Sequence, residues 1–386
     1  MGTVLQISDR SRPALRRIAS EEEALSAARD LSALLHRRRD GSSDFHNSIL
    51  HGVLDELGQT GLLGITIPDE HGGTDICNAA LAEVVAAVAE ASMTAAEHLR
   101  HHFHVLEALR VAGRDEQKAF FLARALSGDR IGGGLAPVDG ATNLRLRPAD
   151  SGPGFVLWGQ APFHLGDVSA DWLAVAAADA DGDVATLLVP RGTPGLSWHQ
   201  GWSVDHGGTA VAEFDAVHVQ GNTLLPLQLD SRRAAIDMIA DIVQAAIDLG
   251  TARARLRDAI ARLRTSRPLL SAMNGGEPRP HPTAVARIGD LAIRIEAASA
   301  LLERVGRKID CAQISPTADN VLTAKLAVAG ARALTAALLD DASVPILDPL
   351  SGEAPFEVGE TGRLQGSVDA GCHAVGSFHL NGAAPF

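Results

Sequence analysis

Apolar residues recur at helical spacing through the first third of the chain. Over residues 21–39 the apolar positions Ala24, Ala28, Leu31 and Leu35 form one stripe, with acidic residues at the start and basic residues at the end, as the helix dipole favours. The same spacing predicts four further helices, over residues 46–61, 78–92, 94–112 and 115–127. A short extended piece is expected at 62–73, where proline and a glycine pair close it.

The pattern changes at the glycine run 132–134. Short apolar runs follow, β-branched or aromatic in places and separated by Gly, Asp and Pro, and they predict a small antiparallel β-domain. The alanine-rich run 172–178 is included among its strands. From residue 231 the helical period returns in three long amphipathic stretches, 231–264, 286–312 and 319–341, which predict an antiparallel bundle.

These patterns predict a mainly α protein with a small central β-domain. We expect a mobile arm over residues 1–20, a helical domain over 21–130, a β-domain over 131–228 and a helical bundle over 229–386. Within the bundle, residues 342–372 are rich in Pro, Gly and Ser, which is typical of a long functional or poorly ordered loop.

Composition narrows the possible functions. The 386 residues are 46% apolar and 21% charged, with a net charge of −13, so a nucleic-acid binder or a protein held on an anionic membrane is disfavoured. We expect no membrane-spanning helix and no secretory signal. The three cysteines are far apart in sequence, which fits a cytoplasmic protein. The chain has no tyrosine, so a tyrosine acid or radical is excluded.

Several segments resemble the acyl-CoA dehydrogenase superfamily, most closely its reduced-flavin-dependent monooxygenases of sulfur acquisition and dibenzothiophene desulfurisation. The resemblance covers roughly residues 20–382. The matching segments are ELGQTGLLGITIPDEHGGTD (56–75), HHFHVLEALRVAG (101–113), DRIGGGLA (129–136), VPRGTPGLS (189–197), AIDLGTARARLRDAIARLRTSRP (246–268), ARIGDLAIRIEAASALLERVGRKID (286–310) and HAVGSFHLNG (373–382). The resemblance implies a homodimer or homotetramer, with FMN or FAD bound between the β-domain and the bundle.

Carried over by position, the family's flavin contacts are mostly altered. Gly133 stands where the family has a polar residue, often Asn, and Leu165 stands where it has a Ser or Thr hydroxyl. Glu357 and Glu360 replace two arginines that help to hold the flavin phosphate, and glutamate would repel that group. Gln365 replaces a histidine associated with the flavin–oxygen chemistry.

Two flavin-side residues persist, Trp202 and Arg267, although either also fits a structural role. We therefore expect that no flavin is bound in the usual way, with FMN or FAD as the alternative. The residues expected to line the emptied pocket are His102, Phe103, Gly133, Leu135, Phe163, Leu165, Trp202, Arg267 and Gln365.

Histidines offer acid–base chemistry for such a pocket, since imidazole titrates near neutral pH. His104 falls where the family has an aromatic residue that projects into the pocket, and it is the first candidate. His164 is the second, because strict strand alternation turns it away from Leu165 unless a bulge near Pro162 brings it back. His101 and His104 share a helix face and with His164 offer an alternative metal site, but no metal is expected.

Three functions stay open at this point. The preferred one is an enzyme of small-molecule, secondary metabolism that catalyses a cyclisation, dehydration or isomerisation with histidine acid–base groups. The second is a reduced-flavin-dependent monooxygenase with atypical flavin contacts. The third is a catalytically silent subunit that binds a ligand or a partner. Asp237 and Asp241, one helical turn apart in the bundle, are expected to be solvated and to take no part.

Overall fold

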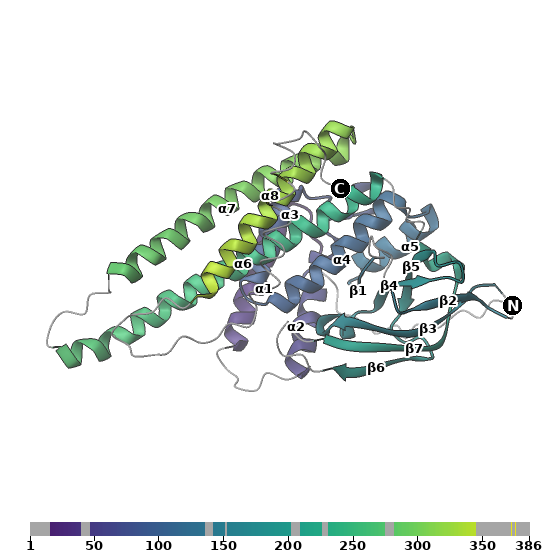
Figure 1. Cartoon of the computed structure of the whole chain (residues 1–386), viewed down its shortest axis with the longest axis horizontal. Coiled ribbons are helices and arrows are strands. Elements are labelled where there is room, and N and C mark those ends of the chain that lie inside the picture. The colour runs from purple at the N-terminus through teal and green to yellow at the C-terminus, as the bar shows by residue number, and fades with distance from the viewer. Residues whose placement is uncertain are drawn as a thin grey trace.

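The computed structural model describes residues 16–39, 47–135, 142–150, 153–201, 209–225, 231–274 and 282–344, together with residues 372 and 375. The predicted class is confirmed, because helices dominate and one sheet stands between the first and last helical segments (Figure 1). Four residues with predicted roles at the flavin site lie outside the described part of the chain: Trp202, Glu357, Glu360 and Gln365.

The predicted N-terminal helices are present. Their bounds are α1 Glu21–Arg39, α2 Asn47–Gln59, α3 Asn78–Ala89, α4 Met93–Ala112 and α5 Asp115–Leu126. The expected extended piece at 62–73 is wrong: it forms two 3-10 turns, η1 Leu62–Gly64 and η2 Asp69–His71. Ile65 and Ile67 between these turns are fully buried, so this segment is a compact loop that packs on the core.

The described strands form one eight-stranded sheet with the path β6-β7-β3-β2-β4-β5-β8, and β1 pairs with β4. The bounds are β1 Ile131–Gly133, β2 Arg145–Pro148, β3 Phe155–His164, β4 Trp172–Ala178, β5 Val184–Pro190, β6 Leu196–Gly201, β7 Thr209–Val219 and β8 Leu224–Leu225. The sheet is mixed, not purely antiparallel as expected, because β1 and β2 both run parallel to β4. Strand direction depends on which strands pair, and the apolar pattern carries no signal for that.

Three long helices make up the last part, α6 Ser231–Asn274, α7 Pro282–Ile314 and α8 Ala318–Ser343. Two glycines let α6 and α7 approach α3. A Cβ at Gly250 would lie 2.2 Å from the carbonyl oxygen of Ala86, and one at Gly306 would lie 2.3 Å from the nitrogen of Ala79. Only glycine therefore fits where these helices cross α3.

By length and composition, α8 is apolar enough to cross a membrane, with a mean hydropathy of 1.4 over its best window. In this fold α8 packs against α6 and α7, although only 39% of that window is buried in the chain itself. Three large apolar residues of α7, Val285, Ile293 and Ile314, are exposed in the single chain.

The helix α4 occupies the position that joins the two halves of the molecule. It contacts α3 and α6 on its bundle side, and β1 and the 3-10 helix η3 Leu165–Ser169 on its sheet side. Figure 1 shows α4 between the long bundle helices and the sheet. A side chain on α4 can therefore contact either half, depending on which face of the helix carries it.

Candidate functional site

Four histidines lie on α4, and the helix period sends them in two directions. The helix starts at Ser92, whose hydroxyl accepts a hydrogen bond from the backbone N–H of Ala95. His98, His101 and His102 are buried. His101 and His102 bond to groups of the sheet side or of the neighbouring turns, His98 lies against Asp167, and His104 bonds to α6.

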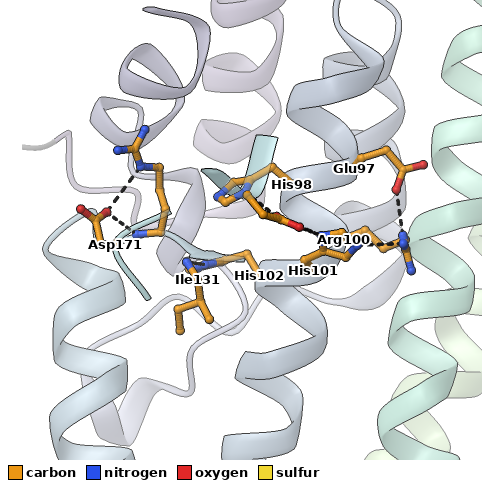
Figure 2. A network of polar contacts seen from close by, with 9 residues as sticks. Glu97, His98, Arg100, His101, His102, Ile131 and Asp171 are labelled. Carbon is orange, nitrogen blue, oxygen red and sulfur yellow. Dashed lines mark hydrogen bonds and ion pairs between the residues drawn. The ribbon is translucent and has the colours of Figure 1, made fainter. Parts of the chain in front are cut away.

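His102 is held by two hydrogen bonds in the core. Its Nδ1 accepts the backbone N–H of Ile131 at 3.1 Å (Figure 2). Its Nε2 therefore donates to the carbonyl oxygen of Leu63 at 2.9 Å. Burial, together with the nearby His98, lowers the pKa of His102 to about 3. Both nitrogens are used and the ring is fully buried, so His102 ties α4 to η1 and β1 and does not contact a ligand.

Asp167 is a buried carboxylate between two histidines. The Nδ1 of His101 lies 3.1 Å from Oδ1 and 3.0 Å from Oδ2 of this carboxylate. The Nδ1 of His98 lies 3.4 Å from the same Oδ1. Burial alone would raise the pKa of Asp167, but the hydrogen-bonded ring of His101 and the neighbouring ring of His98 outweigh burial and lower the pKa. Asp167 therefore stays ionised and orients the ring of His101.

Arg100 continues this chain of contacts towards the bundle. Its Nη2 lies 2.9 Å from Nε2 of His101, and its Nε donates to a carboxylate oxygen of Glu97 at 3.0 Å (Figure 2). Because arginine only donates, the Nε2 of His101 accepts, and His101 is the neutral imidazole with its proton on Nδ1. Burial opposes the ionisation of Glu97, but Arg100 and the nearby histidines prevail and lower its pKa.

A cavity of about 440 Å³ opens beside this chain of contacts, between α4, η3 and the strands β1, β3 and β4. Its volume falls within the roughly 300–1,000 Å³ typical of small-molecule sites. The lining residues are His101, Gly133, Gly134, Thr142, Asn143, Leu144, Gln160, Ala161, Pro162, Phe163, His164, Asp167, Ala174, Val175 and Ala176.

His164 lies in this cavity, with its ring centre 5.0 Å from that of His101. Among the described residues its ring nitrogens have no hydrogen-bond partner. Burial lowers its pKa, and His101 lowers it further. The bulge near Pro162 that could have turned His164 back is absent from β3, whose register shifts between Leu157 and Gly159.

His104 lies one turn beyond His101 but engages α6. Its Nε2 lies 3.0 Å from Oδ1 of Asp237, and the Nε of Arg233 donates to both oxygens of that carboxylate. The expectation that Asp237 is solvated is therefore wrong, because it bridges two partners. Asp241 does have a side chain that is 54% exposed. Burial lowers the pKa of His104, although Asp237 favours the charged ring.

The other predicted pocket residues divide into three groups. Gly133 and Phe163 line the cavity, as His164 does. Phe103 and Leu135 are buried in the helical core, and Leu165 begins η3 without reaching the cavity. The last group, Trp202, Gln365 and the side chain of Arg267, is outside the described part of the chain.

Sequence reasoning did not identify Glu97, Arg100 or Asp167 as site residues. Each is a single charged residue without a motif around it. Asp167 is 66 positions from His101, and only the turn after β3 brings them together. The one available signal was helical spacing, which puts Glu97, Arg100, His101 and His104 on one face of α4.

The cavity can be tested against a flavin by its own geometry. Gly133 has a φ of 83°, and a Cβ there would lie 2.2 Å from the carbonyl oxygen of Ala174, so this backbone has no room for a polar side chain. Phe163 and His164 offer ring surfaces, but none of the described lining residues is Lys or Arg. The described lining thus fits a ring system and supplies no cation for a flavin phosphate.

The comparisons with known proteins agree with this architecture. Residues 21–129 match the family "Acyl-CoA dehydrogenase, N-terminal domain", and residues 242–343 match "Acyl-CoA dehydrogenase, C-terminal domain". Among curated proteins, no sequence matches the chain.

Solved structures with this fold include flavin-binding monooxygenases. TdsC from Paenibacillus sp. A11-2, in complex with FMN and indole, superposes with a TM-score of 0.76 at 19% identity, covering 95% of this chain and 98% of its own. The methanesulfinate monooxygenase MsuC from Pseudomonas fluorescens gives 0.74 at 20% identity, with the same coverage. KijD3, in complex with FMN and a dTDP-linked amino sugar, gives 0.69 at 20% identity, covering 91% and 89%. At these identities the likeness concerns the fold.

The order of the elements, the two family matches over the helical parts and the structural neighbours all agree. The chain belongs to the acyl-CoA dehydrogenase superfamily.

Proposed function

We propose that this protein is an enzyme that converts a small organic molecule in the cavity between α4 and the sheet without a resident flavin. The reaction is non-redox, of the cyclisation, dehydration or isomerisation type, and imidazole groups act on the substrate. The observation that carries this proposal is His164, which lines the cavity with no hydrogen-bond partner among the described residues.

The geometry around His164 supports this role. His101 lies beside it, fixed by Asp167, so the two rings keep their relative positions while a substrate binds. The Gly133 backbone and the absence of a cation among the described lining residues argue against a flavin in the same space.

His104 stays in the proposal as the second imidazole, from the bundle side. The carboxylate of Asp237 orients the His104 ring, an arrangement found in many acid–base sites. The side chain of His104 is 14% exposed. It does not line the described cavity, so its role requires a substrate that extends from the cavity towards α6.

A second candidate is a reduced-flavin-dependent monooxygenase, which the FMN-bound structures of TdsC and KijD3 favour. Phe163 and His164 would offer ring surfaces to a bound FMN, which would supply the redox chemistry. Under either candidate we propose a cytoplasmic homodimer or homotetramer, with α7 and α8 in the interface.

The first test is the flavin content of the purified protein. We expect a colourless protein that releases no flavin when it is denatured, and a product formed from a small-molecule panel with no flavin or reductant added. A yellow protein with one flavin per chain, or turnover only with reduced FMN, would overturn the proposal in favour of the second candidate.

A further inference from the structure

Three side chains of metal-ligating type converge beside the cavity, and two of them, His101 and His164, line it. Glu97 and His101 are one turn apart on α4, and His164 is the last residue of β3. One ligand atom from each lies within 4.8 Å of the other two. The sequence offered His104 as the third member with His101 and His164, but His104 faces Asp237 and Glu97 takes its place.

The nitrogen atoms are presented as a metal requires. Asp167 accepts the Nδ1–H of His101, which leaves the Nε2 lone pair directed away from the carboxylate. Metal-binding histidines commonly donate their other N–H to a carboxylate in this way. Among the described residues His164 has no partner, so no existing hydrogen bond holds its ring.

Arg100 holds the centre of this cluster in the present structure. Its guanidinium donates both to Glu97 and to Nε2 of His101. A cation is therefore already favoured at this point, and the local field suits a positive charge. The side chain of Arg100 is 23% exposed and flexible, so it can rotate into solvent when another cation arrives.

We propose that Glu97, His101 and His164 form a binding site for a divalent transition-metal ion of the Zn²⁺ class, with Arg100 as the group that the metal displaces. Two imidazoles and one carboxylate are a ligand set typical of catalytic zinc, which keeps a further position open. Here that position faces the cavity.

The inference rests on the proposed function only in taking the cavity as the reaction site. With a metal bound, His164 would be a metal ligand and would no longer act on the substrate itself. The metal would then act on the substrate instead, through a bound water or by binding a substrate oxygen. The binding itself is independent of any turnover, so it can fail while the proposed function stands.

The test is calorimetric titration of the chelator-treated full chain with Zn²⁺, and with Co²⁺ as a spectroscopic probe. We expect one Zn²⁺ per chain with a Kd of ~1 µM or tighter, and visible Co²⁺ absorption typical of nitrogen ligands. Asp167→Asn should weaken binding by ~10–100-fold, as outer-shell carboxylates do, and His164→Ala and Glu97→Gln by more.

Two further variants separate this site from other zinc binding. Arg100→Met removes the competing cation and should tighten binding by about tenfold. His218→Ala, an exposed histidine on β7, should leave the affinity unchanged. No saturable binding below ~100 µM, or equal affinity in the wild type, His164→Ala and Glu97→Gln, would overturn the site. Because Glu97→Gln is nearly isosteric, it tests the site even if His164→Ala does not fold.

Discussion

The stability of the protein should fall in mild acid, and His102 should make a separable contribution to that loss. In the folded protein burial holds the pKa of His102 at about 3, against an ordinary value of 6.5. Between about pH 8 and pH 5 the unfolded chain therefore binds a proton at this residue and the folded chain does not. A lowered histidine pKa gives stability that is complete above 6.5 and is lost as the pH falls towards the folded value.

The size of the stability loss follows from the difference between the assay pH and 6.5, the pKa of His102 in the unfolded chain. Each tenfold change in proton concentration below the unfolded pKa favours the unfolded state by about 1.4 kcal/mol, so at about pH 5 the loss is ~2 kcal/mol. Both ring nitrogens are hydrogen-bonded in a fully buried site, and adding a proton would break the bond from Ile131 to Nδ1. No solvent screening reduces the effect.

The assay is urea unfolding of the wild type and of His102→Gln at both pH values, with a chelator present. Glutamine does not titrate, so the variant is expected to lose ~2 kcal/mol less than the wild type between about pH 8 and pH 5. Titrating groups far from His102 cancel in this difference. Equal losses in the two proteins would refute the reasoning, because His102 would then titrate alike in both states.

Three other predictions concern packing, chemistry and assembly. Gly250→Ala should destabilise the protein by roughly 1–3 kcal/mol, because its methyl group meets Ala86 of α3, while Gly289→Ala on α7, with open space around it, should be neutral or slightly stabilising in thermal melts. His164→Ala should lower turnover by ~10²–10⁴-fold with a melting temperature within a few degrees of the wild type, and unchanged turnover would remove it from the mechanism. Light scattering at micromolar concentration should give a multiple of the 40.3 kDa chain mass, and a monomer would contradict the packing of α7 and α8 between subunits.

The sequence predicted the helices well because their cause is local. The apolar period of α4 and the long bundle helices appears directly in the residues, and the resemblance then fixed their order. The extended reading of 62–73 failed because buried turns and strands share short apolar runs, here Ile65 and Ile67. The parallel pairing of β1 with β4 depends on contacts between distant segments and has no local signal.

The candidate site was only half predictable for the same reason. Histidine content marked α4 and His164, but the partners that decide their roles are far away in sequence: Asp167 for His101 and Asp237 for His104. Strand alternation also misjudged His164, because β3 ends at that residue and a 3-10 turn begins at Leu165, where alternation no longer applies.

The claim that this fold works here without a resident flavin is tested most directly by calorimetric titration of the purified protein with FMN. The Gly133 backbone and the lack of Lys or Arg in the described lining of the cavity predict a Kd weaker than ~100 µM, a standard free energy of only about −5.5 kcal/mol. Stoichiometric binding with a Kd of ~1 µM would contradict the account and make the protein a flavin enzyme like its structural neighbours.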